Sequence, residues 1–156
     1  MDACVAMLRQ VHAQDGYPLI WPASPAGWLG GGGQAAAWVA DDAGSISGHV
    51  ALARPHAGEA ASAWAGALSA RVDDLLCVSL LFVAPQQRGH GIGTLLLSTA
   101  LGAVRPRGAR AALEVVSLNL HAVALYRAQG WQEIGSVSYD WLPEGAQSLL
   151  FVPPSS

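Results

Sequence analysis

The sequence predicts a single domain, residues 1–156, of the mixed α/β class. Three observations support this prediction. The length of 156 residues suits one domain with its own hydrophobic core. Segments with the periodicity of helices alternate with short apolar segments that are typical of strands. In the middle of the chain, an apolar strand runs into a glycine-rich turn and then into an apolar helix.

The composition limits the classes of function. Hydrophobic residues make up 52% of the chain and charged residues 12%, yet no apolar run reaches the roughly 18 residues of a membrane span. We therefore expect a soluble domain whose exposed apolar patches favour a homodimer. A net charge of −3 argues against nucleic-acid binding. Two cysteines without a secretory signal predict reduced thiols in the cytoplasm, and the scattered histidines predict no metal site.

The first half of the chain predicts a helix, an irregular segment and a hairpin. Apolar residues recur at helical spacing over residues 2–13. Residues 15–29, rich in proline and tryptophan, are too interrupted for a long helix. Residues 34–40 and 46–53 predict the two strands of a hairpin. His49 lies in the second of these strands, where a lone histidine is either structural or faces a substrate.

The remaining elements follow from local signals. Gly130, directly after the last residue with helical periodicity, marks the end of the final predicted helix. An alanine-rich segment at 57–70 is either a helix or a mobile excursion. The other predicted elements are a central strand at 72–83, a helix after the glycine turn, a basic turn at 105–110, a strand at 111–116, a helix at 119–129 ended by Gly130, a strand opening at 131–135, and closing strands at 136–139 and 147–152.

The glycine-rich turn has the properties of a phosphate-binding site. A helix that starts after such a turn leaves backbone N–H groups unpaired, and its dipole favours an anion there. Arg88 adds a cation beside Gly89, Gly91 and Gly93. A P-loop is excluded because the chain contains no lysine, and the G-x-G-x-G spacing disfavours the dinucleotide fingerprint. From the glycines alone, a plain strand-to-helix turn remains an alternative.

Two longer motifs resolve this choice by resemblance. Residues 88–93, which fit Q/R-x-x-G-x-G/A after the strand end Leu81-Phe82-Val83-Ala84-Pro85, resemble motif A of the GNAT superfamily of N-acetyltransferases. The run L-E-V-x-x-x-N-x-x-A-x-x-L-Y-x-x-x-G-W from Leu113 to Trp131 is similar to the second signature of that superfamily. The resemblance covers residues 34–140 well and the two ends of the chain less well.

The resemblance implies the GNAT fold and acetyl-CoA as cosubstrate. In this fold, a mostly antiparallel mixed sheet flanked by helices contains two parallel strands that splay apart around the coenzyme. The backbone of the central strand would pair with the pantetheine arm, the turn would bind the pyrophosphate, and Asn119 would contact the arm or cap its helix. The implied cofactor-binding residues are Leu81, Phe82, Val83, Arg88, Gly89, His90, Gly91, Ile92, Gly93, Thr94, Asn119 and Tyr126. The basic turn at 105–110 would be a solvated loop or lie near the 3′-phosphate of CoA.

The implied reaction is direct transfer of the acetyl group to a primary amine. Tyr126 matches the tyrosine that protonates the departing thiolate, and a phenol with a pKa of about 10 is a donor at neutral pH. Glu114 is the candidate base, because burial can raise the pKa of a glutamate toward neutrality. Its alternatives are a solvent-facing or arginine-paired glutamate, with Asp73, Asp74 and His49 as reserve bases.

Other features remain open at this point. The chain begins almost inside its first helix, whereas the family usually opens with a strand, so that strand is absent or something else covers the sheet edge. Tyr17, Trp21 and Trp28 either line the acceptor site or plug one end of the sheet. The acceptor is a small molecule or a protein N-terminus. The alternative function is a non-catalytic acyl-CoA-binding sensor.

Overall fold

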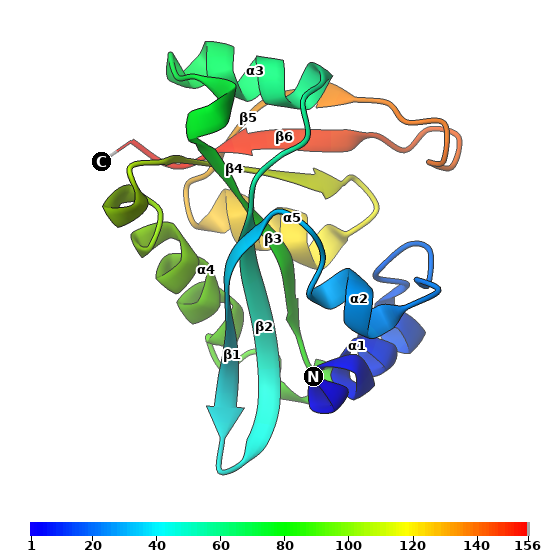
Figure 1. Cartoon of the computed structure of the whole chain (residues 1–156). Helices are drawn as coiled ribbons and strands as arrows, with labels where there is room; N and C mark the ends of the chain where they lie inside the picture. The colour runs from blue at the N-terminus through cyan, green and yellow to red at the C-terminus, as the bar shows by residue number, and fades with distance from the viewer. Residues whose placement is uncertain (156) are drawn as a thin grey trace.

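The structure, a computed structural model, describes residues 1–155 as one six-stranded sheet with helices on both faces (Figure 1). The strand order in the sheet is β1-β2-β3-β4-β6-β5. The elements are α1 (Asp2–Asp15), α2 (Pro25–Leu29), β1 (Gln34–Asp42), β2 (Ser45–Ala53), α3 (Glu59–Leu68), β3 (Leu75–Val83), α4 (Ile92–Gly102), β4 (Arg110–Val116), α5 (Leu120–Ala128), β5 (Gln132–Val137) and β6 (Ser148–Val152).

The sheet is mixed, with one parallel pair of strands at its centre. Strands β1, β2 and β3 pair antiparallel, as do β4, β6 and β5, while β3 and β4 run parallel. The parallel pairing covers only the register from Leu75↔Arg110 to Cys77↔Ala112. Beyond it, β3 pairs with β2 alone and β4 with β6 alone, so the two halves of the sheet separate. This is the splay that the resemblance implies.

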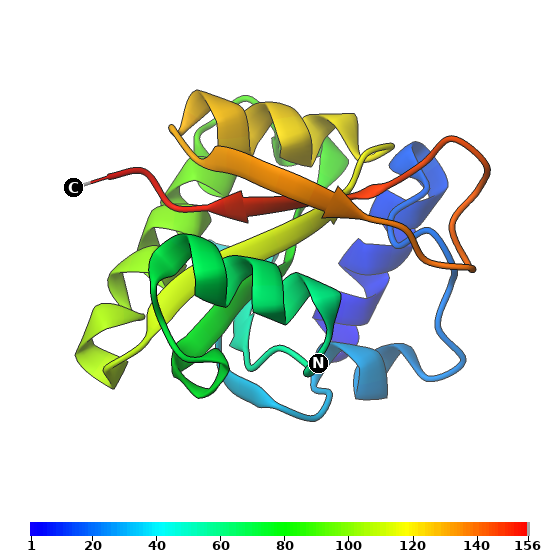
Figure 2. The same ribbon diagram turned by 90° about the horizontal axis from the view of Figure 1, so that it is seen from above.

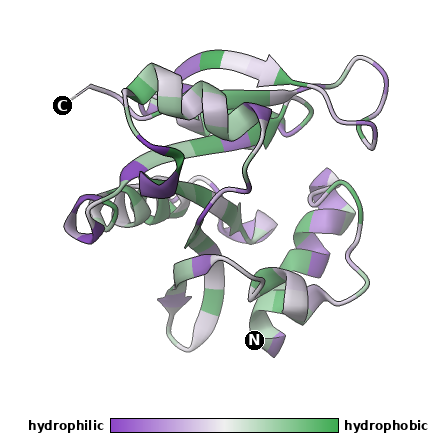
Figure 3. Cartoon of the chain, turned by 45° about the horizontal axis from the view of Figure 1, so that its top comes forward, coloured by the Kyte–Doolittle hydropathy of each residue, from purple (hydrophilic) through white to green (hydrophobic). Residues whose placement is uncertain are grey.

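Helices cover both faces of the sheet, and successive side chains of β3 pack against opposite layers. Leu76 packs toward the face covered by α4 and α5, whereas its neighbour Leu75 packs toward Trp64 of α3 on the opposite face. Seen from above, α3 and α5 lie on opposite sides of the β4-β6-β5 half (Figure 2). Helices α1 and α2 pack against the other end of β3, at Phe82. Strand β3 is hydrophobic along most of its length, as expected for a strand with helices on both of its faces (Figure 3).

A bulge bends β3 just before the point where it lines the site. The register with β2 shifts between His49 and Ala51, opposite Leu80, which has a left-handed backbone with φ 52°. The Nδ1 atom of His49 lies 2.8 Å from the carbonyl oxygen of Leu80, and its ring stacks on Phe82. Burial lowers the pKa of His49, so the neutral ring can donate this bond. His49 is therefore structural in this fold.

The first described element is a helix, α1, and it contributes no strand to the sheet. Within residues 1–155, β1 pairs only with β2, so its outer edge has no strand beside it. Gly16 ends α1 in a left-handed conformation with φ 73°. Among the helices within residues 1–155, none is long and apolar enough to cross a membrane.

Several predicted boundaries needed correction. The alanine-rich segment is a helix, α3, held by the buried Trp64. The central strand starts at Leu75 because residues 72–74 form a 3₁₀ turn. Strand β5 ends at Val137 rather than at 139, because the chain leaves the sheet there for the loop before β6.

Candidate active site

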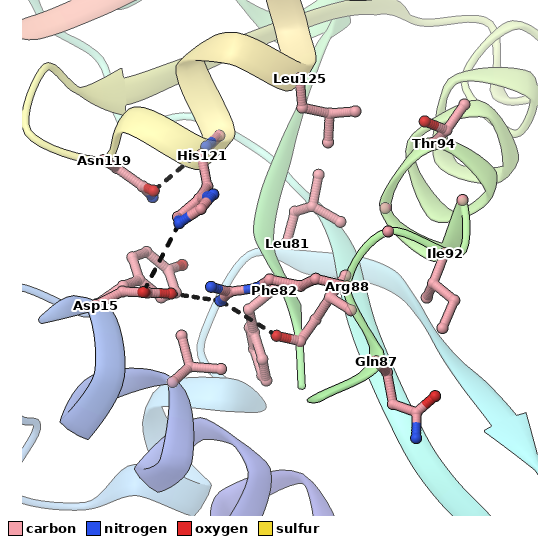
Figure 4. A pocket seen from close by; sticks show the side chains of 17 residues that line it. Asp15, Leu81, Phe82, Gln87, Arg88, Ile92, Thr94, Asn119, His121 and Leu125 are labelled. Atoms are coloured by element: carbon pink, nitrogen blue, oxygen red, sulfur yellow. Dashed lines mark hydrogen bonds and ion pairs between the residues drawn. The ribbon is translucent and has the colours of Figure 1, made fainter. Parts of the chain in front are cut away.

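A cleft of about 310 Å³ lies beside the end of β3, beyond the residues that pair with β4 (Figure 4). Its walls come from the end of β3, the glycine-rich turn, the first turns of α4 and α5, and the end of α1. Ten of the residues predicted to bind the cofactor line it: Leu81, Phe82, Val83, Arg88, Gly89, Gly91, Ile92, Gly93, Thr94 and Asn119. The side chain of His90 is exposed outside this lining, with Nδ1 3.0 Å from the carbonyl oxygen of Gln87.

The turn presents free backbone donors to this cleft. Gly89 and Gly91 have φ values of 83° and 80°, which other residues rarely adopt. Gly91 caps α4 without a side-chain bond, and no hydrogen bond within the described residues occupies the N–H groups of residues 89–94. A Cβ atom added at Gly93 would lie 3.3 Å from Leu125 of α5, so α4 approaches its neighbour closely here. Unpaired amides at a helix N-terminus are suited to bind an anion.

Arg88 already has partners in this cleft. Its guanidinium donates to a carboxylate oxygen of Asp15 and, over 3.3 Å, to the carbonyl oxygen of Val83 (Figure 4). The Nε2 atom of His121 lies 3.9 Å from the other carboxylate oxygen of Asp15. Sequence reasoning missed Asp15, His121, Gln87 and Leu125 as lining residues. Gln87 and His121 adjoin motif residues and were open to prediction, whereas Asp15 arrives from a distant helix.

A second cavity of about 650 Å³ lies beside the cleft. It shares Asp15, Tyr17, Leu81 and Asn119 with the cleft, so the two spaces adjoin between the end of α1, β3 and the start of α5. Of the three aromatic residues predicted for the acceptor wall, Tyr17 and Trp28 line this cavity. Trp21 does not, because its ring packs on α1 against Arg9 and His12.

Glu114 lies in the wall of the second cavity, on β4 opposite Leu150. Its Oε2 atom accepts hydrogen bonds from the hydroxyl of Tyr139 at 2.9 Å and from that of Ser148 at 2.6 Å. The Glu114 residue is exposed rather than buried, and no arginine pairs with it among the described residues. Burial, followed by the hydrogen bond and charge of Glu114 and the charge of Glu59, raises the pKa of Tyr139 to about 12. Tyr139 is therefore a constant donor at neutral pH.

Tyr126 projects from α5 into the same cavity rather than into the cleft. The residue is buried, and its ring packs against Trp131 and Phe151. Burial, with a smaller contribution from Tyr17, raises its pKa, so the phenol keeps its proton at neutral pH. Asn119 caps α5 through the N–H of Ala122 at 3.4 Å and also lines both spaces, so its two predicted roles are compatible.

The remaining candidates lie away from both spaces. Asp73 pairs with Arg71 at the surface, and neither Asp73 nor Asp74 lines the cleft or the cavity. In the basic turn, the guanidinium of Arg107 donates to the carbonyl oxygen of Ala103, and no arginine of this turn lines the cleft.

Comparison with known proteins decides the family. Residues 13–131 match the pattern of the Acetyltransferase (GNAT) family. The chain belongs to this family. The match includes both motifs, the glycine-rich turn at residues 88–93 and the run from Leu113 to Trp131. None of the curated proteins compared by sequence matches significantly.

Solved structures of GNAT proteins resemble the chain over most of its length. Nourseothricin acetyltransferase is 31% identical, with a TM-score of 0.55, over 72% of this chain and 60% of that chain. Ribosomal-protein-alanine N-acetyltransferase from Brucella melitensis is 21% identical, with a TM-score of 0.67, over 96% of this chain and 93% of that one. The structure of yncA from Salmonella typhimurium with its cofactor acetyl-CoA is 15% identical, with a TM-score of 0.66, over 96% and 87%.

As a member of the GNAT family the chain is an acetyltransferase, and this family uses acetyl-CoA as its cosubstrate. The residues of the cleft fit this coenzyme. Unpaired amides at a helix start suit its diphosphate, and the free edge of β3 after Cys77 suits an extended amide-bearing arm.

Proposed function

We propose that this GNAT protein transfers the acetyl group of acetyl-CoA directly to the primary amine of a small molecule or a protein N-terminus. The main support is that the cleft and the second cavity adjoin and share four lining residues, which come from the end of α1, from β3 and from the start of α5. Two substrates held in adjoining spaces react without a covalent enzyme intermediate, because binding supplies their proximity.

The chain would hold the cosubstrate mainly through its backbone. The amides of residues 89–94, with Thr94, would bind the diphosphate, and the unpaired edge of Phe82 and Val83 would pair with the pantetheine arm like an added strand. Asn119 would contact the same arm. Arg88 contributes less net charge than the sequence indicates, because Asp15 already neutralises it.

Glu114 would act as the base. Its Oε2 atom is occupied by two hydroxyl donors, whereas Oε1 has no hydrogen-bond partner among the described residues. An ammonium group in the cavity would give its proton to this carboxylate, directly or through water, and become nucleophilic. The two hydroxyl donors keep the carboxylate in one orientation.

Tyr126 would act as the acid. The amine nitrogen forms a bond to the acetyl carbon as the carbon–sulfur bond breaks, and the Tyr126 hydroxyl protonates the departing sulfur. The second proton that leaves the nitrogen, as the amide forms, restores the Tyr126 phenol directly or through water. Since burial keeps this phenol protonated, it can donate at neutral pH. Tyr17, whose pKa is also raised by burial, lines both spaces and is a further phenol of the site beside Tyr126 and Tyr139.

Release of free CoA thiol from acetyl-CoA, measured with a panel of amines, tests this proposal. We expect Glu114→Gln to lower kcat by about 10² to 10⁴ and to leave the acetyl-CoA affinity unchanged by calorimetry. A sensor that only binds acyl-CoA would bind acetyl-CoA tightly and show no thiol release with any amine.

Three further properties are part of the proposal. Residues 1–156 would form one acetyltransferase domain, because a single sheet carries both spaces. The free cysteines Cys4 and Cys77 suit the reducing cytoplasm. The open edge of β1, where Val39 is exposed, suits a homodimer.

A further inference from the structure

We infer that the acceptor is a small primary amine on an aromatic or otherwise apolar body that carries no carboxylate or other anionic group. This inference rests on the proposed function and names the substrate class of the same site. Three properties of the second cavity support it: its charge, its apolar opening and its size.

The charged side chains of the cavity are all acidic. Asp15 and Glu114 line it, and none of its lining residues is an arginine or a histidine. Asp15 is neutralised by Arg88, but Glu114 faces no cation among the described residues. A cationic ammonium would therefore find a partner here. A carboxylate on the acceptor would lose its water without a cation to replace it, and would be repelled by Glu114.

The opening of the cavity is bordered by exposed apolar side chains. Large hydrophobic residues that remain exposed elsewhere are scattered, whereas four lie in this one lining. They are Leu19, Ile20, Leu118 and Trp141, with exposed fractions of 36%, 63%, 53% and 52%. Exposed apolar side chains gathered around one opening mark a binding surface. An apolar acceptor would cover them.

The walls are aromatic and the space has the size of a small-molecule site. Trp141 stacks on Tyr139 with ring centroids 5.4 Å apart and planes 10° apart, and Tyr17 and Trp28 supply two more rings. Flat rings favour flat ligands by stacking and edge contacts. A volume of about 650 Å³ lies in the range of small-molecule sites. The structure therefore favours a compact aromatic amine over a polypeptide.

Matched amines test the charge and the apolar body separately. The wild-type protein is assayed with acetyl-CoA and 2-phenylethylamine, phenylalanine, tryptamine, tryptophan, spermidine and a phenylalanine-initiated peptide. We expect kcat/KM for 2-phenylethylamine to exceed that for phenylalanine, and kcat/KM for tryptamine to exceed that for tryptophan, by about 100-fold or more. The carboxylate of each amino acid would lose its water in the cavity without gaining a cationic partner. We expect the aromatic amines also to exceed spermidine and the peptide.

A variant that adds a positive charge provides the second arm. Leu118→Arg places a cation at the opening. The ratio of kcat/KM for phenylalanine to kcat/KM for 2-phenylethylamine should rise by about 10-fold over its wild-type value. Leu120→Arg is the matched control, because Leu120 is also exposed but does not line the cavity. It should leave this ratio unchanged.

The outcomes separate the two proposals. Equal or greater turnover of amino acids, of spermidine or of the peptide overturns the acceptor class while leaving acetyl transfer intact. An unchanged ratio in Leu118→Arg, with folding verified by circular dichroism, also overturns it. No thiol release with any amine, despite acetyl-CoA binding by calorimetry, overturns the proposed function itself.

Discussion

Gly48 allows α4 to approach the sheet, and its replacement by alanine tests how the anion site is positioned. A Cβ atom at this position of β2 would lie 2.7 Å from Cδ1 of Leu96 and 3.0 Å from Cγ2 of Ile92. Carbon atoms pack best at about 3.5–4.0 Å, so the helix or its side chains must move by about 1 Å. Leu96 is buried and cannot turn into solvent.

We expect Gly48→Ala to destabilise the protein by about 1–2 kcal/mol. Overpacking in a core costs about 1–3 kcal/mol, and the lower chain entropy of alanine in the unfolded state offsets part of this. Since Ile92 begins α4, its displacement should move the first amides of that helix and weaken acetyl-CoA binding by about 3- to 10-fold.

Urea denaturation measures the first effect and calorimetry the second. Gly102→Ala is the control, because it makes the same substitution in α4 where an added Cβ meets nothing within 4 Å. It should stabilise the protein by about 0.5–1 kcal/mol through helix propensity, with unchanged affinity. A Gly48→Ala variant with wild-type stability and affinity would refute the argument that this contact positions the anion site.

Three other predictions concern the site and its support. Gly91→Glu should abolish acetyl-CoA binding by calorimetry, since it puts a negative side chain and a strained positive φ at the anion site, and retained affinity would exclude the amide cradle. Tyr126→Phe should lower kcat by about 10² or more with nearly unchanged acetyl-CoA affinity, and wild-type turnover would remove Tyr126 from the acid role. Because burial lowers the pKa of His49, the stability from its neutral form is complete above the unfolded pKa of about 6.5 and is lost as pH falls through the folded pKa. The stability gap between wild type and His49→Gln, followed by urea denaturation from pH 7.5 to 5, should therefore narrow, and a constant gap would contradict this linkage.

Local motifs predicted the parts of the site that lie close together in the sequence. The strand end at Val83, the turn from Arg88 and the helix start at Ile92 are consecutive, so their composition and spacing carry the geometry. Asn119 and Tyr126 likewise belong to one helix and its cap. The splay itself was implied by the resemblance, because no residue pattern shows where two parallel strands stop pairing.

Contacts between distant segments could not be predicted in this way. Asp15 meets Arg88 only because α1 packs across the end of β3. Tyr139 and Ser148 orient Glu114 from a loop and from β6, neither of which carries a motif. The exposure of Glu114 also depends on these elements, so the sequence alone could not decide between a buried and an exposed carboxylate.

The turn at Gly16 has a consequence for engineering this enzyme. Asp15 and Tyr17, on either side of it, belong to the walls of both spaces, so one backbone turn sets donor and acceptor contacts together. Substitutions that retune acceptor choice in this segment should therefore be non-additive with changes in coenzyme affinity. Libraries that vary Leu118 or Trp141 instead, which line only the acceptor side, offer a route to new selectivity without that epistasis.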